Sequence, residues 1–370
     1  ITTDSQNQSA TELTANGTVN QVEEYEEQYE AIVGKPVKWR KRVVANQTTT
    51  GFRIVLPAEA KNITVKKRVG EIEEFVPIIN KIKNIAVIED TQTHTVLDVG
   101  AGEEWDAFVQ FSVEQGLTGI EALSLIPGSV GATPVQNVGA YGAEVSNVID
   151  SVHVYDIEKE EYKWMSNAEC EFEYRNSVFK KNRGKYIITK VRFILSKEMP
   201  TMPDYPDVVE YFEENYSSLV KAFDSEKNLA INDSRQSLIA SIGSIREAVI
   251  SIRERKLLDY KEVPNCGSFF TNPVIEKSEV ERLQKEFTEM KVYEQADGRY
   301  KVPAGWLLEK AGLKGAKLGP IEISEKHALI LSNPSRTATY KDLQNAERHI
   351  QKTVKEKFGV ELVREPVVCG

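Results

Sequence analysis

An uncharged stretch rich in glycine and proline, PGSVGATPVQNVGAYG at residues 127–142, constrains the fold of this chain more than any other feature. A surface loop of this length normally carries Asp, Glu or Lys, and a core helix does not tolerate four glycines. Glycine allows a positive φ and a close approach of the backbone to another group. The stretch therefore predicts a loop that lies against a partner that is flat, large and mostly uncharged.

The composition is that of an ordinary globular protein, with 41% hydrophobic and 28% charged residues, and a length of 370 residues fits two or three domains. A net charge of −9 argues against a general nucleic-acid binder. The three cysteines show no C-x-x-C spacing and the four histidines are scattered, so we expect neither a disulfide framework nor a metal site. No run approaches the roughly 20 apolar residues of a membrane span. We expect a cytoplasmic protein that does not bind membranes.

Short apolar segments predict strands, and apolar residues at helical spacing predict helices. The predicted strands lie at residues 52–56, 78–82, 86–89, 95–99, 151–155, 162–165 and 186–195. The predicted helices lie at residues 22–33 and 104–115, and around 238–252, 280–287 and 343–358. A strand-rich middle followed by a more helical C-terminal third indicates an α+β protein.

A second glycine-containing segment, GAGEEW at residues 100–105, follows the predicted strand at 95–99 and opens a predicted helix. This order mimics the start of a dinucleotide-binding strand–turn–helix unit. Trp105 occupies the position of the third glycine, where helix and strand must pack closely, and no second unit of this kind follows. A tight turn into a core helix is the better interpretation.

Three further motifs accompany the stretch at 127–142. They are FEYRNSVFK at 172–180, NCGSFFTNP at 265–273 and AGWLLEKAGLKG at 304–315. Together, and in the same order, the four motifs resemble those of the UDP-N-acetylenolpyruvoylglucosamine reductase family, flavoenzymes of bacterial peptidoglycan synthesis. The resemblance extends from about Ile78 to Gly370.

The resemblance implies an α+β fold with two FAD-binding subdomains of the vanillyl-alcohol-oxidase (PCMH) type and a C-terminal substrate-binding domain. The implied parts are a divergent N-terminal FAD-binding subdomain at 1–77, a second FAD-binding subdomain at 78–200, a substrate-binding domain with inserted helices at 201–355, and a C-terminal strand at 356–370 that returns to the active site.

The activity implied by the resemblance is an NADPH-driven, FAD-dependent reduction. A hydride passes from NADPH to FAD and then to the enolpyruvyl carbon of a UDP-sugar, which yields UDP-N-acetylmuramate. This places the chain in cell wall biogenesis, and hence in cell shape, cell cycle and cell division. The expected partners are FAD, NADPH and the UDP-sugar, and the expected state is a monomer.

The family's catalytic residues fall on Arg175, Ser268 and Glu365. Arg175 would stabilise the negative charge that builds up on the substrate, and Ser268 would donate the proton. Glu365 falls on the catalytic position without gaps, but the family has proline before the catalytic glutamate and this chain has Pro366 after it. Glu361 is the alternative, and a surface carboxylate paired with its neighbour Arg364 is the structural explanation of Glu365.

Three residues match substrate-binding positions of the family. Tyr205 resembles the tyrosine of a substrate-covering loop found in one subclass, although Pro206 stands where that loop usually has glycine. Lys256 matches a lysine that contacts nucleotide phosphates, and Asn272 matches the asparagine after GSFF. A solvated helix end is the structural alternative for Lys256.

The resemblance assigns FAD binding mainly to the stretch at 127–142. The predicted contacts are Pro127, Gly128, Ser129, Val130, Gly131, Gln136, Asn137, Gly139, Ala140 and Tyr141, with Asn62 in the N-terminal region. The family's glycine-rich pyrophosphate loop is replaced here by Leu56–Ile63, where Pro57 lacks an N–H and Glu59 adds negative charge. This departure leaves two alternatives: a non-catalytic relative that binds a nucleotide sugar without FAD, and an oxidase with covalent FAD.

Overall fold

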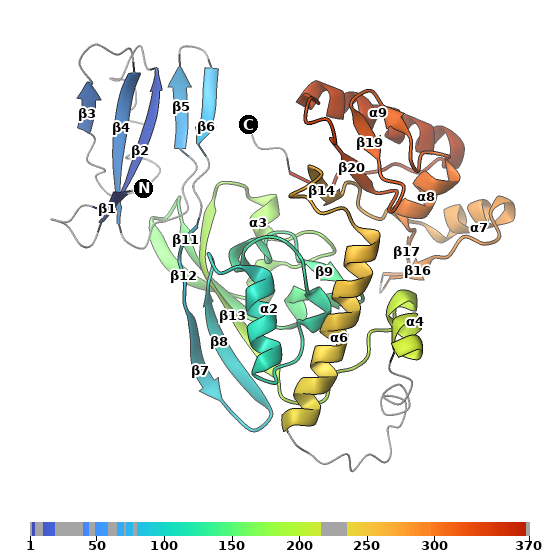
Figure 1. Ribbon diagram of the computed structural model, residues 1–370, viewed down its shortest axis with the longest axis horizontal. Coiled ribbons are helices and arrows are strands. Elements are labelled where there is room, and N and C mark those ends of the chain that lie inside the picture. The colour runs from blue at the N-terminus through green and yellow to red at the C-terminus, as the bar shows by residue number, and fades with distance from the viewer. Residues whose placement is uncertain are drawn as a thin grey trace. The chain divides into compact units, whose positions relative to one another are not determined.

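The computed structural model describes six strands between Thr2 and Val76, and residues 80–215, 235–295 and 297–367 (Figure 1). The chain divides into two compact units, Ile1–Ile250 and Ser251–Val368. The division falls within helix α6, Arg235–Lys256. The four-part division expected from the sequence stays a prediction, and each unit is described below by itself.

The N-terminal strands form an antiparallel sheet and a separate hairpin. The sheet has the order β1-β2-β4-β3 and the hairpin pairs β5 with β6. Their bounds are Thr2–Thr3, Ala10–Thr18, Arg40–Val43, Thr49–Pro57, Val65–Val69 and Ile72–Val76 for β1 to β6. The predicted strand at 52–56 is confirmed within β4, whereas the predicted helix at 22–33 and Asn62 lie outside the described residues.

The centre of the first unit is a five-stranded antiparallel sheet with the order β12-β11-β13-β8-β7 (Figure 1). Its strands are β7 Ile85–Asp90, β8 His94–Gly100, β11 Ile149–Asp156, β12 Glu161–Ser166 and β13 Tyr186–Ser196. All five were predicted within two residues at each end, because each is a short segment rich in apolar and β-branched or aromatic side chains. The interior of β8 and β13 supplies much of the core.

The prediction of a strand at 78–82 is wrong for its described residues, 80–82, which form a loop. Asn80 explains the loop: its Oδ1 accepts a hydrogen bond from the Ile82 N–H at 2.9 Å, and its Nδ2 donates to Ile188 O at 3.1 Å. A short amide side chain that satisfies the backbone two residues on favours a turn over a strand.

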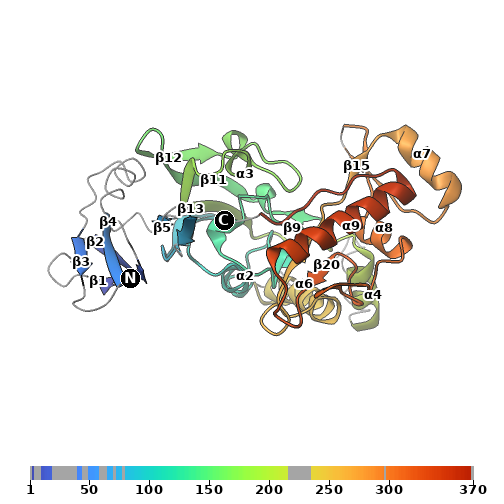
Figure 2. The ribbon, with the colours of Figure 1, turned by 90° about the horizontal axis from the view of Figure 1, so that it is seen from above.

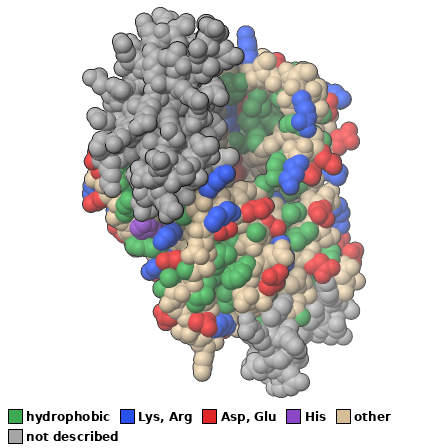
Figure 3. Space-filling model, turned by 60° about the vertical axis from the view of Figure 1, so that its left-hand side comes forward, with side chains coloured by type: hydrophobic (Ala, Val, Ile, Leu, Met, Phe, Trp, Pro, Cys, Tyr) green, Lys and Arg blue, Asp and Glu red, His purple; other side chains and the backbone are tan. Residues whose placement is uncertain are grey.

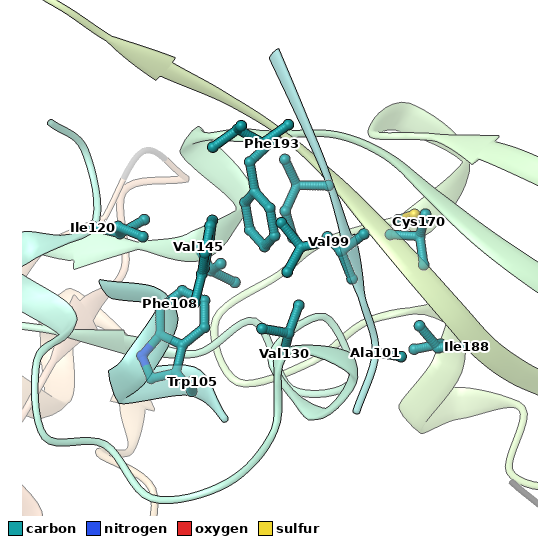
Figure 4. Close-up of a cluster of buried hydrophobic side chains, with 14 of the residues drawn as sticks. Val99, Ala101, Trp105, Phe108, Ile120, Val130, Val145, Cys170, Ile188 and Phe193 are labelled. Atoms are coloured by element: carbon teal, nitrogen blue, oxygen red, sulfur yellow. The ribbon is translucent and has the colours of Figure 1, made fainter. Parts of the chain in front are cut away.

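Helix α2, Trp105–Glu114, covers one face of this sheet with aromatic side chains (Figure 4). The Trp105 and Phe108 rings lie 6.2 and 5.0 Å from the ring of Phe193 in β13, and all three are fully buried. The indole N–H of Trp105 donates to Leu123 O at 2.9 Å, so its polar atom is satisfied inside the core. Val130, from the glycine-rich stretch, belongs to the same core.

The glycines before α2 serve backbone packing. A Cβ on Gly100 would lie 2.4 Å from Ile82 O, and one on Gly102 would lie 2.6 Å from Asn80 O. The loop at 80–83 therefore occupies the space that a dinucleotide pyrophosphate would need in the fingerprint motif. The interpretation of a tight turn into a core helix is confirmed.

The second unit combines small antiparallel sheets with helices. One sheet has the order β14-β20-β19-β18 and the other β15-β17-β16. The strands are β14 Asn265–Ser268, β15 Val274–Ile275, β16 Tyr293–Glu294, β17 Tyr300–Lys301, β18 Lys317–Leu318, β19 Ile321–Ile323 and β20 Ile330–Ser332. The helices are α7 Lys277–Glu286, α8 Ala304–Lys310 and α9 Tyr340–Phe358. The predicted helices α7 and α9 are thereby confirmed.

Helix α9 packs along α8 and against β19 (Figure 2). Its apolar face, which includes Ile350, Val354 and Phe358, is fully buried. Burial of such side chains stabilises the unit by roughly 2 kcal/mol each. Thr339 and Asp342 form a capping box at its start, and Gly359 with φ 74° ends it.

Candidate functional site

Backbone hydrogen bonds join the glycine-rich stretch at 127–142 to the turn before α2 and to the start of that helix. The Gly131 N–H donates to Ala101 O at 2.9 Å, and the Trp105 N–H donates to Gly128 O at 3.0 Å. A Cβ on Gly131 would lie 2.6 Å from the Ala101 Cβ, so only glycine lets the two segments approach this closely. The stretch is thus a fixed surface rather than a loose loop.

The outer side of this loop presents unoccupied backbone donors. Pro127 and Gly128 are exposed, and Gly128 has φ 129° with no atom within 4 Å of a Cβ built on it. Within the part of the chain that the structure describes, the N–H groups of Gly128 and Ser129 have no hydrogen-bond acceptor. Open backbone with free N–H donors fits a flat, carbonyl-bearing ring such as the flavin of FAD.

Asn137 uses its side chain inside the protein. It is buried with φ 45°, its Nδ2 donates to Glu144 Oε2 at 2.8 Å, and its Oδ1 accepts from the Ser146 N–H at 3.1 Å. The structure thus places Asn137 where it shapes the hairpin β9–β10, Gly139–Ala140 and Ala143–Glu144. Its predicted contact with FAD stays a prediction.

Arg175 lies against the same stretch. Its Nη2 donates to Gly139 O at 2.6 Å and its Nη1 to Asn137 O at 3.5 Å. Its guanidinium also lies 5.2 Å from the centre of the Tyr174 ring. The structure therefore places the guanidinium of Arg175 against the backbone of this stretch. Its catalytic role stays a prediction.

Ser177 and Lys180 hold the loop that carries Arg175, a role that the sequence analysis did not assign. The Ser177 hydroxyl donates to Val135 O at 2.6 Å and accepts from two N–H groups at the start of helix α3, Val178–Lys181. Lys180 Nζ donates to Arg175 O at 3.1 Å and to Gln136 Oε1 at 3.5 Å. A serine directly before a helix is the signal that could have identified this cap.

Tyr205 is brought next to the glycine-rich stretch within the same unit. It is 40% exposed, and its ring lies 5.2 Å from that of Tyr141 in an edge-to-face arrangement at 78°. Pro206 begins helix α4, Pro206–Asn215, and proline is well suited to the first position of a helix. The proline in place of the family's glycine therefore starts a helix directly after the tyrosine.

In the second unit, Ser268 ends strand β14 with a free hydroxyl. Its Cα lies opposite Ile330 of β20, and the residue before it, Gly267, has φ 71°. Among the residues described, no group hydrogen-bonds to the Ser268 Oγ. The hydroxyl is therefore available to donate a proton.

The backbone of Glu365 pairs with that of Phe269, the residue after this serine, because the segment 363–365 runs antiparallel to 269–271. The Glu365 N–H donates to Phe269 O at 2.9 Å, and the Thr271 N–H donates to Val363 O at 3.0 Å. The expected C-terminal strand is here one isolated bridge between Phe270 and Arg364. Glu361, in contrast, is exposed and forms an ion pair with Lys355 at 2.6 Å. The placement favours Glu365 over Glu361.

Asn272 and Lys256 are the remaining predicted substrate residues. Asn272 Oδ1 accepts from the Ala304 N–H at 2.8 Å, so this atom caps helix α8. Lys256 is half-buried in the last turn of α6. Burial lowers the pKa of His327, and the charges of Lys256 and Lys314 lower it further. This interaction places Lys256 near a histidine that the sequence analysis did not single out.

The described residues hold neither a metal-binding cluster nor a membrane-spanning helix. No cluster of three or more His, Cys, Asp or Glu side chains there could hold a metal ion. None of the described helices is long and apolar enough to cross a bilayer.

Two models of known protein domains match this chain. Residues 54–166 match the family model for an FAD binding domain, and residues 258–369 match that for the C-terminal domain of UDP-N-acetylenolpyruvoylglucosamine reductase. A solved UDP-N-acetylenolpyruvylglucosamine reductase from Thermus caldophilus is 23% identical over 72% of this chain and 70% of its own, with a TM-score of 0.46.

Curated relatives of this chain carry the same enzyme name. UDP-N-acetylenolpyruvoylglucosamine reductase from Dechloromonas aromatica is 41% identical over 275 residues, which is 73% of this chain and 75% of the relative. The reductase from Bdellovibrio bacteriovorus is 36% identical over 322 residues, or 85% and 89% of the two chains. This chain belongs to the UDP-N-acetylenolpyruvoylglucosamine reductase family.

Proposed function

We infer that this chain is an FAD-dependent oxidoreductase that uses NADPH to reduce UDP-N-acetylglucosamine enolpyruvate to UDP-N-acetylmuramate in peptidoglycan synthesis. The observation that carries this inference is that a member of the reductase family places the Glu365 segment against Phe269, directly after a Ser268 whose hydroxyl has no hydrogen bond among the described residues.

The described residues fit FAD at the stretch 127–142. Gly128 and Ser129 would donate their free N–H groups to the flavin, and Arg175 would keep a positive charge beside it. Bound there, FAD would supply the hydride-transfer chemistry that connects NADPH to the enolpyruvyl carbon. The match to the FAD binding domain begins at residue 54 and so includes the segment Leu56–Ile63 that lacks the family's glycines.

Ser268 is the proposed proton donor. Addition of hydride to one enolpyruvyl carbon leaves negative charge on the neighbouring carbon and on the carboxylate, and that carbon must receive a proton. Ser268 Oγ would hold and deliver this proton, with the Glu365 carboxylate as its electrostatic neighbour. A serine is a weak acid by itself, so its activity depends on groups placed next to it.

Arg175 is the proposed stabiliser of the developing negative charge. Its guanidinium donates to two backbone carbonyls, which fix its direction. A preorganised cation of this kind stabilises charge that is present only in the transition state. We further propose that Tyr205, Lys256 and Asn272 contact the UDP-sugar.

We propose that the enzyme works in the cytoplasm, where NADPH and nucleotide sugars are available, as a monomer that supports cell shape and division through cell wall synthesis. A nucleic-acid partner is not part of this proposal. The net charge is −9, and Lys and Arg alternate with Asp and Glu on the face shown in Figure 3. Size-exclusion chromatography with light scattering tests the monomer.

The first test is the visible absorption spectrum of the purified protein, followed by NADPH oxidation with and without the enolpyruvyl substrate. A flavin spectrum and substrate-dependent NADPH oxidation are expected. A protein that stays colourless after addition of FAD would overturn the reductase assignment in favour of a binding relative. Flavin that resists extraction by denaturation would indicate an oxidase with covalent FAD.

A further inference from the structure

One question left by the proposed function is what fixes Glu365 beside Ser268. The family pattern has proline before the catalytic glutamate, and this chain has Arg364 there and Pro366 after it. Proline fixes its own φ near −65°, whereas arginine leaves the backbone free to move. Another interaction must therefore restrict the chain at this point.

Arg364 makes such an interaction through its guanidinium. Its Nε donates to Glu347 Oε1 at 2.9 Å, its Nη2 donates to Glu347 Oε2, and its Nη1 donates to Tyr340 Oη at 3.2 Å. Both partners belong to helix α9. The bidentate geometry fixes the direction of the guanidinium as well as its position.

The pair is mostly removed from water, which sets it apart from ordinary surface pairs. The side chains of Arg364 and Glu347 are 19% and 10% exposed, whereas those of the nearby pair Lys355–Glu361 are 62% and 73% exposed. The pKa of Arg364 is raised, chiefly by its hydrogen bonds to Glu347, so the cation persists at any physiological pH. The sequence analysis offered an ion pair between Glu365 and its neighbour Arg364 as the structural explanation of Glu365. In the structure, the guanidinium of Arg364 instead donates to both carboxylate oxygens of Glu347.

The same guanidinium also contacts the residue that follows Ser268. It lies 5.6 Å from the centre of the Phe269 ring, and Phe269 is fully buried. The backbone of Arg364 forms the bridge with Phe270. Arg364 is therefore in contact with the serine's strand on one side and adjacent in sequence to Glu365 on the other.

Backbone pairing alone gives this segment little support. One isolated bridge, formed by the hydrogen bonds of the Thr271 and Glu365 N–H groups, joins it to 269–271. Helix α9 supplies two side-chain links to the segment: Gln351 Nε2 donates to Leu362 O at 3.0 Å, and Glu347 pairs with Arg364. The ion pair is the link that acts on the residue directly before Glu365.

We propose that Arg364 and Glu347 form a clamp that positions Glu365 next to Ser268, in place of the proline used elsewhere in the family. This inference rests on the proposed function, because it assigns Arg364 and Glu347 as positioning residues for that reaction. Neither is proposed to touch the substrate or FAD.

The test uses a double variant, Arg364→Met with Glu347→Leu, in the full-length FAD-bound protein. Removal of both charges avoids an unpaired buried carboxylate, and apolar replacement of such a pair usually preserves stability. Stopped-flow absorbance follows flavin reduction by NADPH and flavin reoxidation by the enolpyruvyl substrate separately. We expect unchanged reduction, and reoxidation slower by about ten- to a hundredfold because a displaced catalytic group costs that much.

Lys355→Met is the matched control. It removes an ion pair to the same C-terminal segment, but an exposed one that ends at Glu361. We expect both half-reactions of this variant to stay within about twofold of wild type, since exposed pairs contribute little. Slow reoxidation in Lys355→Met as large as in the double variant would overturn the clamp, because tethering of the segment in general would then explain the effect.

Two further outcomes would also overturn the inference. One is reoxidation at the wild-type rate in a folded double variant, and the other is equal slowing of both half-reactions together with a lower melting temperature. Both leave the proposed function intact as long as wild-type protein is reoxidised by the substrate. If wild-type reduced flavin does not react with the substrate at all, the proposed function itself fails.

Discussion

The Ser268 hydroxyl makes no hydrogen bond within the described part of the chain, so its removal separates chemistry from stability. In Ser268→Ala, we expect flavin reduction by NADPH to continue at the wild-type rate. Reoxidation by the enolpyruvyl substrate should slow by roughly 10²–10⁴-fold, the usual contribution of a general acid. Stopped-flow measurement of both half-reactions checks this.

Thermal unfolding of Ser268→Ala provides the control, because loss of an unengaged surface hydroxyl should change stability by no more than about 0.5 kcal/mol. Equal losses in the two half-reactions would contradict the role of Ser268 as proton donor.

His327 should make stability depend on pH. Burial lowers its pKa from 6.5, with Lys256 and Lys314 adding to the effect and Glu309 opposing it. The unfolded chain therefore takes up the proton first as pH falls, so the free energy of unfolding is unaffected by this group above pH 6.5 and declines below it. Once both the folded and the unfolded state are protonated, each pKa unit of lowering reduces the free energy of unfolding by about 1.4 kcal/mol.

Urea unfolding at pH 7.5 and pH 5 of wild type and His327→Gln tests this sign. We expect the wild type to lose more stability than the variant between the two pH values. His153 also has a lowered pKa, mainly from burial, but it is present in both proteins and cancels in the comparison. A larger loss in His327→Gln would show that the sign is wrong.

The chemistry of single residues was only partly predictable from the sequence. The resemblance of two motifs to those of the family identified Arg175 and Ser268 as candidate catalytic residues. A guanidinium and a hydroxyl group also suit the implied reaction. The sequence could not show that Asn137 and Asn272 use side-chain atoms within the fold, since their partners Glu144 and Ala304 are set by tertiary structure. Nor could it show that Arg364 pairs with Glu347 rather than with its neighbour.

At the scale of elements, Ser177 links helix α3 to the glycine-rich stretch. Its fully buried hydroxyl caps α3 and donates to Val135 O, so Ser177→Ala removes both interactions at once. We expect a stability loss of about 1–2 kcal/mol from the cap and the unsatisfied carbonyl. We also expect weaker FAD binding, because the loop with Arg175 loses its attachment to the stretch.

Thr339→Ala is the matched variant, since it removes the cap of α9 in the other unit. It should lose similar stability while its FAD affinity, measured by flavin fluorescence titration, remains that of wild type. Equal FAD affinity in Ser177→Ala and Thr339→Ala would contradict the proposed link between α3 and the cofactor.

Regular elements were predictable where one side-chain period runs without interruption. The apolar face of α9 repeats over 343–358, and buried and more exposed side chains alternate over 189–195 of the strand β13, so both were predicted correctly. The strand prediction for 78–82 failed at the loop 80–84 for two reasons. Asn80 hydrogen-bonds to the backbone two residues on, and the loop packs against Gly100 and Gly102, some twenty residues away. Apolar content alone carries no information of that kind.

At the scale of the whole molecule, the two compact units suggest a test of where FAD binds. The predicted FAD contacts lie in the first unit, whereas Ser268 and Glu365 lie in the second. A ligand that binds only the folded first unit stabilises it by about 2.7 kcal/mol at a hundred times its dissociation constant. If the units unfold separately, calorimetry of the apoprotein should show two transitions, and FAD should raise only one of them.

The second unit identifies which transition responds. Leu307 is fully buried in α8. Leu307→Ala should reduce the free energy of unfolding of the second unit by about 2–5 kcal/mol and so lower the temperature of that unit's transition. FAD should raise the other transition. If two transitions are present and FAD raises the one that Leu307→Ala lowers, the cofactor binds the second unit, and the assignment of FAD to residues 127–142 is wrong. If FAD moves neither transition, the replacement of the family's glycines at Leu56–Ile63 has abolished binding, and the reductase assignment fails with it.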